Sequence, residues 1–319
     1  MISGRTILRY LKNLDEYLDQ FHYEESTYFE HLISIAFSKS LYLPYYTINN
    51  EDNSVEQRVT WNGSDNNGIF SKSPAGKTDI IAYCCGFYIV IEATRKTGSG
   101  QWTDEFAQAL RHCKAFVRTE GLDPRDVYIV LVTTKLHEDT YRSLRHQPPR
   151  EYKFVPLEKD VLSRILETSI LAFTIRHLDL RALFNNIPQL LTSSTSLEDF
   201  RQTLEEESKN WQKEVLKQEK ETFIGVKSYE AMKKINRPAV VVGEIFESLL
   251  KHPFVGQYLN IVGEQLSSCD IEKILVNESL GYRAGRTIQT DEPLLECVPC
   301  TDFKGRGLRL IRAVEGIGC

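Results

Sequence analysis

The most constraining feature of this 319-residue chain is a pair of predicted strands that each carry a carboxylate. Residues 77–83 read Lys-Thr-Asp-Ile-Ile-Ala-Tyr, and residues 87–96 read Phe-Tyr-Ile-Val-Ile-Glu-Ala-Thr-Arg-Lys. The turn between them is Cys84-Cys85-Gly86, and its glycine is free to adopt a positive φ. The two segments therefore predict a β-hairpin with Asp79 on its first strand and Glu92 on its second.

The position of Glu92 at the end of an apolar strand points to a function. Side chains alternate between the two faces of a strand, so Glu92, Thr94 and Lys96 share one face. The five residues before Glu92 are apolar or aromatic, and a carboxylate in such a place is costly unless it is paired or binds a metal. Two acids side by side, with a hydroxyl and an amine near them, suit a divalent cation and a phosphodiester. The alternative is that Asp79 and Glu92 form salt bridges or cap turns.

The elements predicted around the hairpin define the fold class. Residues 25–37 and 104–119 have the apolar spacing of amphipathic helices, and residues 97–103 between hairpin and second helix form a turn-rich loop. Residues 127–134 form an unbroken β-rich run, typical of a central strand. A helix opening after Lys135, a strand over 152–157 and a helix over 158–167 follow. This order predicts an α/β protein, an α/β/α sandwich around a mixed sheet.

One face of the helix predicted over residues 104–119 is polar. Glu105, Gln108 and His112 fall at i, i+3 and i+7, next to the apolar stripe. With Gln101 just upstream, this face is expected to look toward the hairpin carboxylates. The alternative for His112 is an ordinary surface histidine.

The hairpin resembles the core of the PD-(D/E)XK nucleases, in which an Asp and a following Glu-x-Lys hold magnesium and activate water. Thr78-Asp79 stands where Pro-Asp is usual, and Glu92-Ala93-Thr94 stands where Glu-x-Lys is usual. Because Thr94 replaces the lysine, Lys96 on the same face is the candidate to stand in for it. The resemblance also implies that Glu30, on the preceding helix, contributes to the metal site; the alternative is a solvent-exposed glutamate.

A narrower resemblance is to the AlwI-type restriction endonucleases and their nicking relatives. It covers roughly residues 25–170 and is carried by Glu92-Ala93-Thr94, the glycine-rich loop with Gln101, Arg111-His112, and the strand ending in residues 135–140. The resemblance implies cleavage of double-stranded DNA with Mg²⁺, for which Mn²⁺ can substitute. It assigns metal binding to Asp79, Glu92 and Glu30, catalysis to Asp79, Glu92, Thr94 and Lys96, and substrate contact to Gln101, Arg111 and His112.

Composition sets the compartment and limits the partners. Hydrophobic residues at 41% and charged residues at 26% are ordinary for a soluble globular protein. No apolar run approaches the ~20 residues that span a bilayer, and seven cysteines, an odd number, argue against a disulfide framework. We expect a cytoplasmic protein without a membrane partner. The net charge of −5 opposes a uniformly DNA-binding surface, but it allows one positive cleft.

The second half of the chain is predicted to be separate from the nuclease-like domain, residues 1–185. Residues 165–192 predict one mainly apolar helix, and Thr195-x-x-Glu198 is a capping box that predicts the start of another. A helical connector over residues 186–225 is either a solvated linker or a dimer seam.

Residues 226–319 predict a smaller helical, winged-helix-like module. Helical patterns at 239–250, 256–266 and 268–277 precede short extended runs around 286–288, 294–298 and 308–314. Basic residues give its end a DNA-binding character: Arg283, Arg286, Lys304, Arg306, Arg309 and Arg312. The alternative is a packing or dimerisation domain.

The sequence as a whole predicts a metal-dependent DNA endonuclease of a type II restriction or defence system. Cleavage of both strands needs two active centres, so a homodimer or a partner subunit is expected. Three alternatives remain open. The first is a nuclease of the same fold that acts on RNA or branched DNA. The second is a catalytically silent nuclease fold that only binds DNA, with Thr94 marking lost catalysis. The third is an interaction protein built on its C-terminal module.

Overall fold

The computed structural model describes residues 3–18, 25–42, 45–47, 58–63, 73–74, 76–84, 86–146, 151–172, 178–235, 240–276, 295–301 and 307–313. The chain forms two compact units. The first comprises residues 1–170 and 176–211, and the second comprises residues 171–175 and 212–319. The predicted domain boundaries at residues 185 and 225 stay a prediction.

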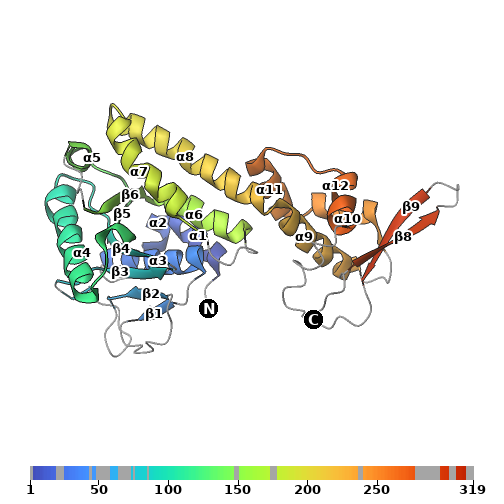
Figure 1. Ribbon diagram of the computed structural model, residues 1–319, viewed down its shortest axis with the longest axis horizontal. Coiled ribbons are helices and arrows are strands. Elements are labelled where there is room, and N and C mark those ends of the chain that lie inside the picture. The colour runs from blue at the N-terminus through green and yellow to red at the C-terminus, as the bar shows by residue number, and fades with distance from the viewer. Residues whose placement is uncertain are drawn as a thin grey trace. The chain divides into compact units, whose positions relative to one another are not determined.

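A six-stranded mixed sheet is the centre of the first unit (Figure 1). Its strands lie in chain order: β1 (Tyr45–Thr47), β2 (Arg58–Trp61), β3 (Ile80–Cys84), β4 (Phe87–Thr94), β5 (Val127–Thr133) and β6 (Lys153–Glu158). The pairs β2–β3 and β3–β4 are antiparallel, whereas β1–β2, β4–β5 and β5–β6 are parallel. The predicted mixed sheet is confirmed.

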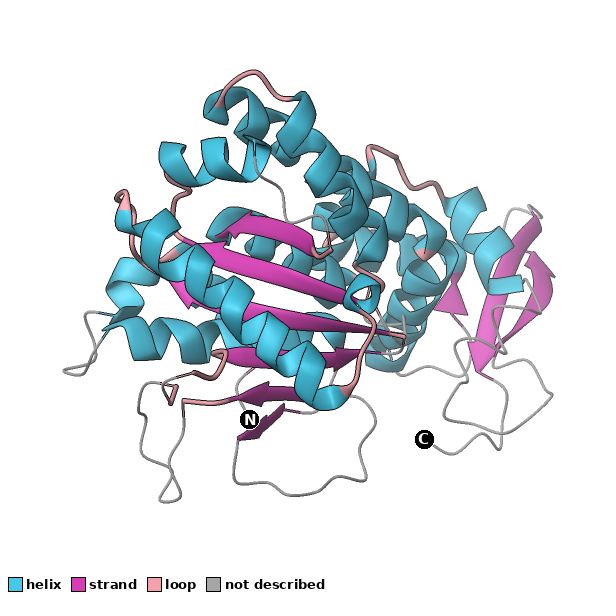
Figure 2. Ribbon diagram, turned by 60° about the vertical axis from the view of Figure 1, so that its left-hand side comes forward, coloured by secondary structure: helices cyan, strands magenta, loops and turns pink. Residues whose placement is uncertain are grey.

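Helices cover both faces of this sheet, as Figure 2 shows for the helix that crosses its front. The helices of the first unit are α1 (Gly4–Lys12), α2 (Leu14–Leu18), α3 (Glu25–Leu41), η1 (Gln101–Phe106), α4 (Ala107–Glu120), α5 (Glu138–His146), α6 (Lys159–Leu171), α7 (Arg181–Ser193) and the start of α8 (Leu197–Gln218). Tyr88 of β4 packs on Phe116 of α4, and Tyr128 of β5 packs on Phe184 of α7. Because Tyr88 is level with Val127, Tyr128 points to the other face. The predicted α/β/α layering is confirmed.

The predicted hairpin forms from β3 and β4, with Ile80 opposite Ile91 at its open end. Gly86 adopts a φ of 80° in the turn, a conformation that glycine reaches without strain. In β4, Phe87 and every residue from Ile89 to Thr94 is buried. The helix α3, which supplies Glu30, packs against β2, β3 and β4.

Three predicted boundaries differ from the structure. Residues 165–192 are not one helix, because α6 ends at Leu171 and α7 begins at Arg181. The N-cap of α8 is Ser196, whose hydroxyl accepts a hydrogen bond from the Asp199 N–H, while the Asp199 carboxylate accepts one from the Thr195 N–H. The capping pair is therefore displaced by one residue from Thr195 and Glu198. The predicted loop over 97–103 ends early, since helical structure already begins at Gln101.

The second unit contains the end of α8, four further helices and a small sheet. The helices are α9 (Lys220–Ile235), α10 (Val242–Leu250), α11 (Pro253–Val262) and α12 (Ser268–Val276), and the sheet has the antiparallel order β7 (Val240–Val241), β9 (Gly307–Ala313), β8 (Leu295–Thr301). Its core is made of apolar side chains, and the rings of Phe223 and Tyr258 stack in it with their centroids 4.2 Å apart. No helix in the described part of either unit has the length and apolarity needed to cross a membrane.

The helices and the terminal hairpin that the sequence predicts for residues 226–319 are present in the second unit. The assignment of this module as winged-helix-like stays a prediction. The extended run around residues 286–288 and the basic residues Arg283, Arg286, Lys304 and Arg306 lie outside the described residues. The side chains of Arg309 and Arg312 do as well, although their backbone belongs to β9.

Candidate active site

Asp79 and Glu92 lie together at the open end of the hairpin. Asp79 directly precedes β3, and one of its carboxylate oxygens accepts a hydrogen bond of 3.0 Å from the backbone N–H of Ala93 in β4. The Asp79 carbonyl accepts another from the Asn62 N–H after β2, at 2.9 Å. Bonds from two neighbouring segments therefore fix Asp79 beside the buried Glu92, which is only 2% exposed.

Burial is the main cause of a raised pKa at both of these carboxyl groups. Burial raises the pKa of Glu92 to about 8, and the charges of Glu105 and Glu30 add to the shift. Burial likewise raises the pKa of Asp79 well above its ordinary value, and the charge of Glu92 is the second cause. The pair therefore binds a proton more readily than exposed carboxylates do, and a bound cation would compensate its charge once the proton has left.

His112 of α4 completes the immediate surroundings of Glu92. Its Nδ1 lies 2.8 Å from Glu92 Oε1, and both side chains are buried. Burial lowers the pKa of His112, while the nearby Asp79 carboxylate opposes that effect. Phe116 lies four residues further along the same helix and packs on β4, which brings His112 to the strand. The predicted orientation of this helix face toward the hairpin acids is thus observed.

The hydroxyl of Thr94 stabilises the chain just after β4. Its oxygen accepts a hydrogen bond of 3.1 Å from the Lys96 N–H, and the Thr94 side chain is buried. The Lys96 ammonium lies 2.7 Å from Glu105 Oε1 and 3.2 Å from Asp104 Oδ2, and the contact with Glu105 raises the pKa of Lys96. Thr94 therefore shapes the backbone, while Lys96 contributes a positive charge that Glu105 and Asp104 hold in place.

Glu105 is a site residue that the sequence assignment missed. It belongs to η1, a π-helical turn whose i→i+5 bonds place side chains differently from an α-helix. Besides its ion pair with Lys96, its charge raises the pKa of both Asp79 and Glu92. The sequence did contain a signal for Glu105. It precedes Gln108 by three residues and His112 by seven, and this spacing placed all three on one helix face.

Gln101 is completely buried and uses both ends of its amide within the protein. Its Nε2 donates to the carbonyls of Lys96 and Lys135 at 2.7 and 3.1 Å, and to Thr133 Oγ1 at 3.0 Å. Its Oε1 accepts from the His137 N–H at 2.8 Å. The predicted contact between Gln101 and the substrate stays a prediction; the observed contacts join the ends of β4 and β5.

The remaining predicted residues lie nearby in different settings. Arg111 is exposed on α4 beside His112, and its charge contributes to the lowered pKa of that histidine. Glu30 of α3 is buried, and its charge raises the pKa of Glu92. In the described part of the chain, no three His, Cys, Asp or Glu side chains are grouped so that they could hold a metal ion. Asp79 and Glu92 are thus brought together, whereas Glu30 does not form a three-residue cluster with them.

The two carboxylates suit a hard divalent cation even without a third protein ligand. Magnesium prefers oxygen donors and keeps several of its waters, so it is usually held by one or two carboxylates together with phosphate oxygens. The raised pKa values of Asp79 and Glu92 are consistent with this chemistry, because a bound cation compensates the charge that both groups carry when ionised. The residues present therefore fit a magnesium ion.

The first unit is thus a mixed sheet between two layers of helices, with acids at the open end of its central hairpin. Residues 4–153 match the model of the AlwI restriction endonuclease family. The matched segment includes the hairpin, α4 and β5. The resemblance to AlwI-type restriction endonucleases is thereby confirmed for this part of the chain.

The chain also resembles solved structures, of which one is described here. The small subunit (R.BspD6I2) of the heterodimeric restriction endonuclease R.BspD6I is 18% identical to this chain, with a TM-score of 0.46. That comparison covers 65% of this chain and 98% of the other. No curated protein matches the chain.

Proposed function

We propose that this chain is a DNA endonuclease of the type II restriction class that depends on a divalent cation. The observation that carries the proposal is the pair of half-buried Asp79 and buried Glu92 within the segment that matches the AlwI family. A buried carboxylate such as Glu92 lowers the stability of a protein unless a partner compensates its charge, so its presence favours a functional site.

Asp79 and Glu92 would hold the cation, Mg²⁺ or in its place Mn²⁺, with Glu30 as an outer contributor of negative charge. A bound cation lowers the pKa of its water and stabilises negative charge on phosphate oxygens. His112 holds the Glu92 carboxylate at 2.8 Å and so fixes its orientation toward the cation. This arrangement requires Glu92 to release its proton when the cation binds.

Lys96 is the candidate to orient the attacking water, because its ammonium lies at the strand end and is held by Glu105 and Asp104. Thr94 contributes through the backbone, since its hydroxyl already accepts the Lys96 N–H. Arg111, exposed next to His112, is available for a phosphate of the substrate. We assign Gln101 the role of holding the strand ends that carry these groups.

The described residues of one chain form one such centre, and one centre cuts one strand. Cleavage of double-stranded DNA on both strands would then require a homodimer or a partner subunit with a second centre. A single chain acting alone would leave a nick.

The test is incubation of the purified protein with supercoiled plasmid and with phage DNA, in Mg²⁺ or in EDTA. The variant Asp79→Asn removes one charge of the pair at constant shape, and Asp126→Asn, an exposed acid of the same unit, is the matched control. We expect nicked circles or discrete fragments with wild type and Asp126→Asn in Mg²⁺, and none in EDTA or with Asp79→Asn.

Other results would assign a different function. DNA binding without cleavage under any metal condition would identify a silent nuclease fold that binds DNA, consistent with the threonine at position 94. Cleavage of RNA or branched DNA, with linear duplex untouched, would keep the chemistry and change the substrate. Cleavage that survives in Asp79→Asn would contradict the assigned site.

A further inference from the structure

Lys135 stands at the same edge of the sheet as the acid pair. The strands β4 and β5 are parallel, and Thr94 is level with Thr133. Lys96 and Lys135 each follow two residues later, so they leave the sheet side by side. The carbonyls of both lysines accept hydrogen bonds from the same nitrogen, Nε2 of Gln101, at 2.7 and 3.1 Å.

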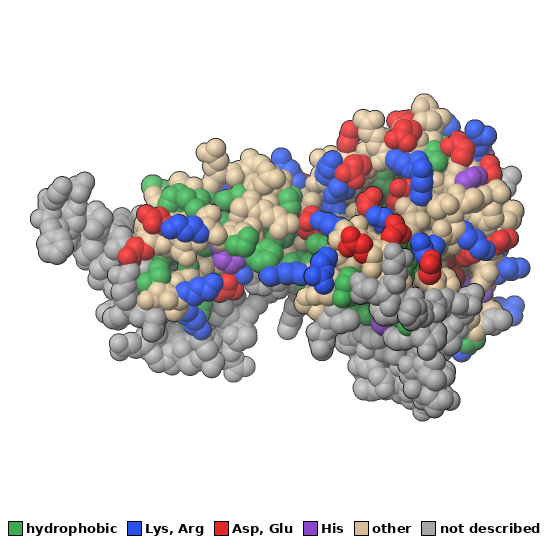
Figure 3. Space-filling model, turned by 180° about the vertical axis from the view of Figure 1, so that it is seen from behind, with side chains coloured by type: hydrophobic (Ala, Val, Ile, Leu, Met, Phe, Trp, Pro, Cys, Tyr) green, Lys and Arg blue, Asp and Glu red, His purple; other side chains and the backbone are tan. Residues whose placement is uncertain are grey.

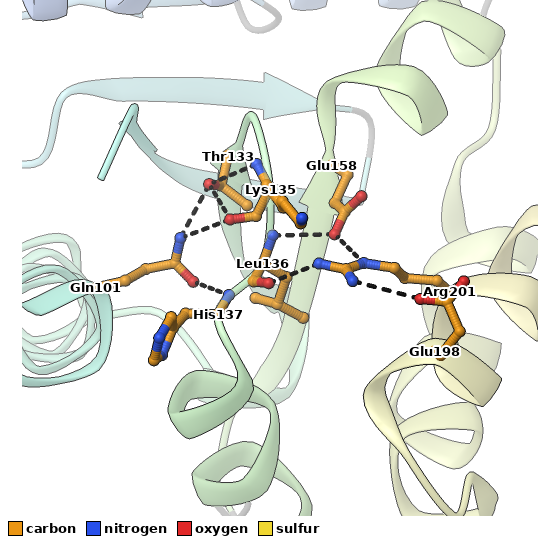
Figure 4. A network of polar contacts seen from close by, with 8 residues as sticks. All are labelled: Gln101, Thr133, Lys135, Leu136, His137, Glu158, Glu198 and Arg201. Carbon is orange, nitrogen blue, oxygen red and sulfur yellow. Dashed lines mark hydrogen bonds and ion pairs between the residues drawn. The ribbon is translucent and has the colours of Figure 1, made fainter. Parts of the chain in front are cut away.

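The backbone around Lys135 is held by side chains from several elements (Figure 4). Gln101 binds the Lys135 carbonyl and the His137 N–H, as described above. On the other side, Glu158 Oε1 accepts the Leu136 N–H at 2.9 Å, and Arg201 Nη2 donates to the Leu136 carbonyl at 2.7 Å. We call Gln101, Glu158 and Arg201 the loop bracket. Loop backbone usually bonds to water, so this bracket fixes a segment that would otherwise move.

The bracket itself is held together by charge. Arg201 Nε donates to Glu158 Oε1 at 2.7 Å, and both side chains are mostly buried, at 22% exposure. Arg201 comes from α8 and Glu158 from the end of β6, so the bracket joins parts of the chain far apart in sequence. A side chain presented from such a fixed backbone loses little entropy on binding a ligand.

The ammonium of Lys135 is available, unlike other cations at this edge. Its side chain is exposed, and within the described residues it has no acidic partner. By contrast, Lys96 is paired with Glu105, and Lys159 with Asp160. Arg95 is paired with Glu25 and Asp15.

The general charge of the molecule makes single cations important. On the face seen in Figure 3, Lys and Arg side chains lie among Asp and Glu and do not form one continuous positive surface. The net charge is −5. DNA binding to such a protein depends on individual cations placed at the phosphate backbone, since the overall field does not attract it.

We propose that Lys135 binds a phosphate of the DNA backbone close to the one that is cleaved, and that Gln101 and Arg201 are positioning residues for it. This inference rests on the proposed function for the choice of DNA as the ligand, and the binding experiment below measures the contact separately from cleavage. The geometry supplies what a phosphate contact needs: a cation with no acidic partner among the described residues, a fixed backbone and a place at the same end of the sheet as the acid pair.

The test measures binding of a fluorescein-labelled DNA duplex by fluorescence anisotropy in EDTA, over a range of NaCl concentrations. For Lys135→Gln we expect Kd to rise about tenfold at low salt, and the slope of log Kd against log[NaCl] to fall by about 0.9, the contribution of one phosphate. Lys135→Arg should restore most of the wild-type affinity and most of the wild-type slope. The matched control is Lys114→Gln, an exposed lysine of α4 two residues beyond His112, on the other side of that helix.

A second arm tests the bracket. Arg201→Gln should raise Kd in the wild-type background and have no further effect in the Lys135→Gln background, because both changes act through one contact. Hydrogen exchange of peptides covering residues 133–137 should become faster in Arg201→Gln, and stay unchanged in Lys209→Gln, which removes another charge from α8.

The outcomes separate this inference from the proposed function. Unchanged Kd and slope in Lys135→Gln, with a wild type that binds DNA, would overturn the inference whether or not DNA is cut. Absence of cleavage by a wild type whose binding depends on Lys135 would overturn only the endonuclease. A wild type that binds no DNA would overturn both. Additive effects of Arg201→Gln and Lys135→Gln would remove the positioning role and leave the phosphate contact.

Discussion

The two units of this protein bury different kinds of side chain. In the described part of the second unit, the buried polar residues are all uncharged: Gln212, Thr222 and Ser228. The first unit buries Glu30, Glu92 and His112 around one strand end. Both units have well-filled apolar cores, so the charged groups of the first are not a requirement of folding.

This difference separates the buried residues that stabilise the fold from the buried charged residues that serve the proposed active site. Transfer of a carboxylate out of water is unfavourable, and its pKa rises until it is neutral or finds a cation. The first unit contains Glu92 with a pKa raised to about 8, whereas the buried side chains in the described part of the second unit are uncharged. We therefore expect changes in the two units to affect different measurements.

The largest effect is expected for Glu92→Gln, which should reduce the rate of cleavage by about 1000-fold. This factor corresponds to the loss of several kcal/mol of charge stabilisation in the transition state. The same change should stabilise the metal-free protein. Glu92 has a pKa raised from 4.5 to about 8, so its contribution is most favourable below pH 4.5 and is lost as the pH rises through 8.

Urea unfolding in EDTA tests this opposition. The midpoint of Glu92→Gln should exceed that of wild type at pH 8 and match it near pH 4. A variant that is less stable than wild type at pH 8 would show that Glu92 is compensated within the protein, and the contrast between the units would disappear.

Next in size is a core change in the second unit. Ile245 of α10 is fully buried in the apolar cluster, and Ile245→Ala should lower the free energy of unfolding by about 3 kcal/mol, through lost burial and the cavity it leaves. Ile245→Val should lower it by about 1 kcal/mol. Cleavage at a temperature where both variants are folded should be unchanged. A loss of cleavage by the folded Ile245→Val protein would show that this core also serves the active site.

A smaller effect is expected at His112. Removing the partner of Glu92 in His112→Leu should reduce cleavage about 10- to 100-fold, as for other residues that orient a metal ligand. His112→Asn retains a group able to hydrogen-bond near the position of Nδ1 and should recover part of the loss. The ratio of the two rates, measured at several Mg²⁺ concentrations, checks the assignment. Equal rates would indicate that only the volume of the side chain matters.

The smallest effect concerns an ion pair in the first unit that has no part in the site. Arg164 Nη2 lies 2.6 Å from Glu205 Oε1 and lowers the pKa of Glu205 to about 2. This carboxylate therefore contributes stability above its ordinary pKa of 4.5, and the contribution is lost as the pH falls from 4.5 toward 2. Glu205 is partly exposed, so solvent screening keeps the effect small.

The measurement is the urea midpoint of Glu205→Gln and wild type at pH 7 and pH 3. Wild type should be slightly more stable at pH 7, and the difference should shrink at pH 3. A difference that grows toward pH 3 would reverse the assigned sign.

Local patterns were sufficient for much of the fold. The apolar run before Glu92, the glycine in the turn and the spacing of residues 104–119 correctly predict the hairpin and the helix that follows it. Such signals depend on neighbours within a few residues, so they survive without a structure. They fail at boundaries: Ser196 replaces Thr195 as the N-cap because both are good caps and packing selects between them.

What the sequence determined by itself is the proximity of Asp79 and Glu92, because a two-stranded hairpin with a short turn fixes which residues are opposite. The tertiary structure decided the rest of the site. The π-helical turn brings Glu105 to Lys96, and α4 brings His112 to Glu92. Gln101, Glu158 and Arg201 meet around Lys135 from three separate elements. Contacts of this kind depend on how helices pack on the sheet, and that packing is set by the whole core, whereas the sequence pattern records only the nearest residues.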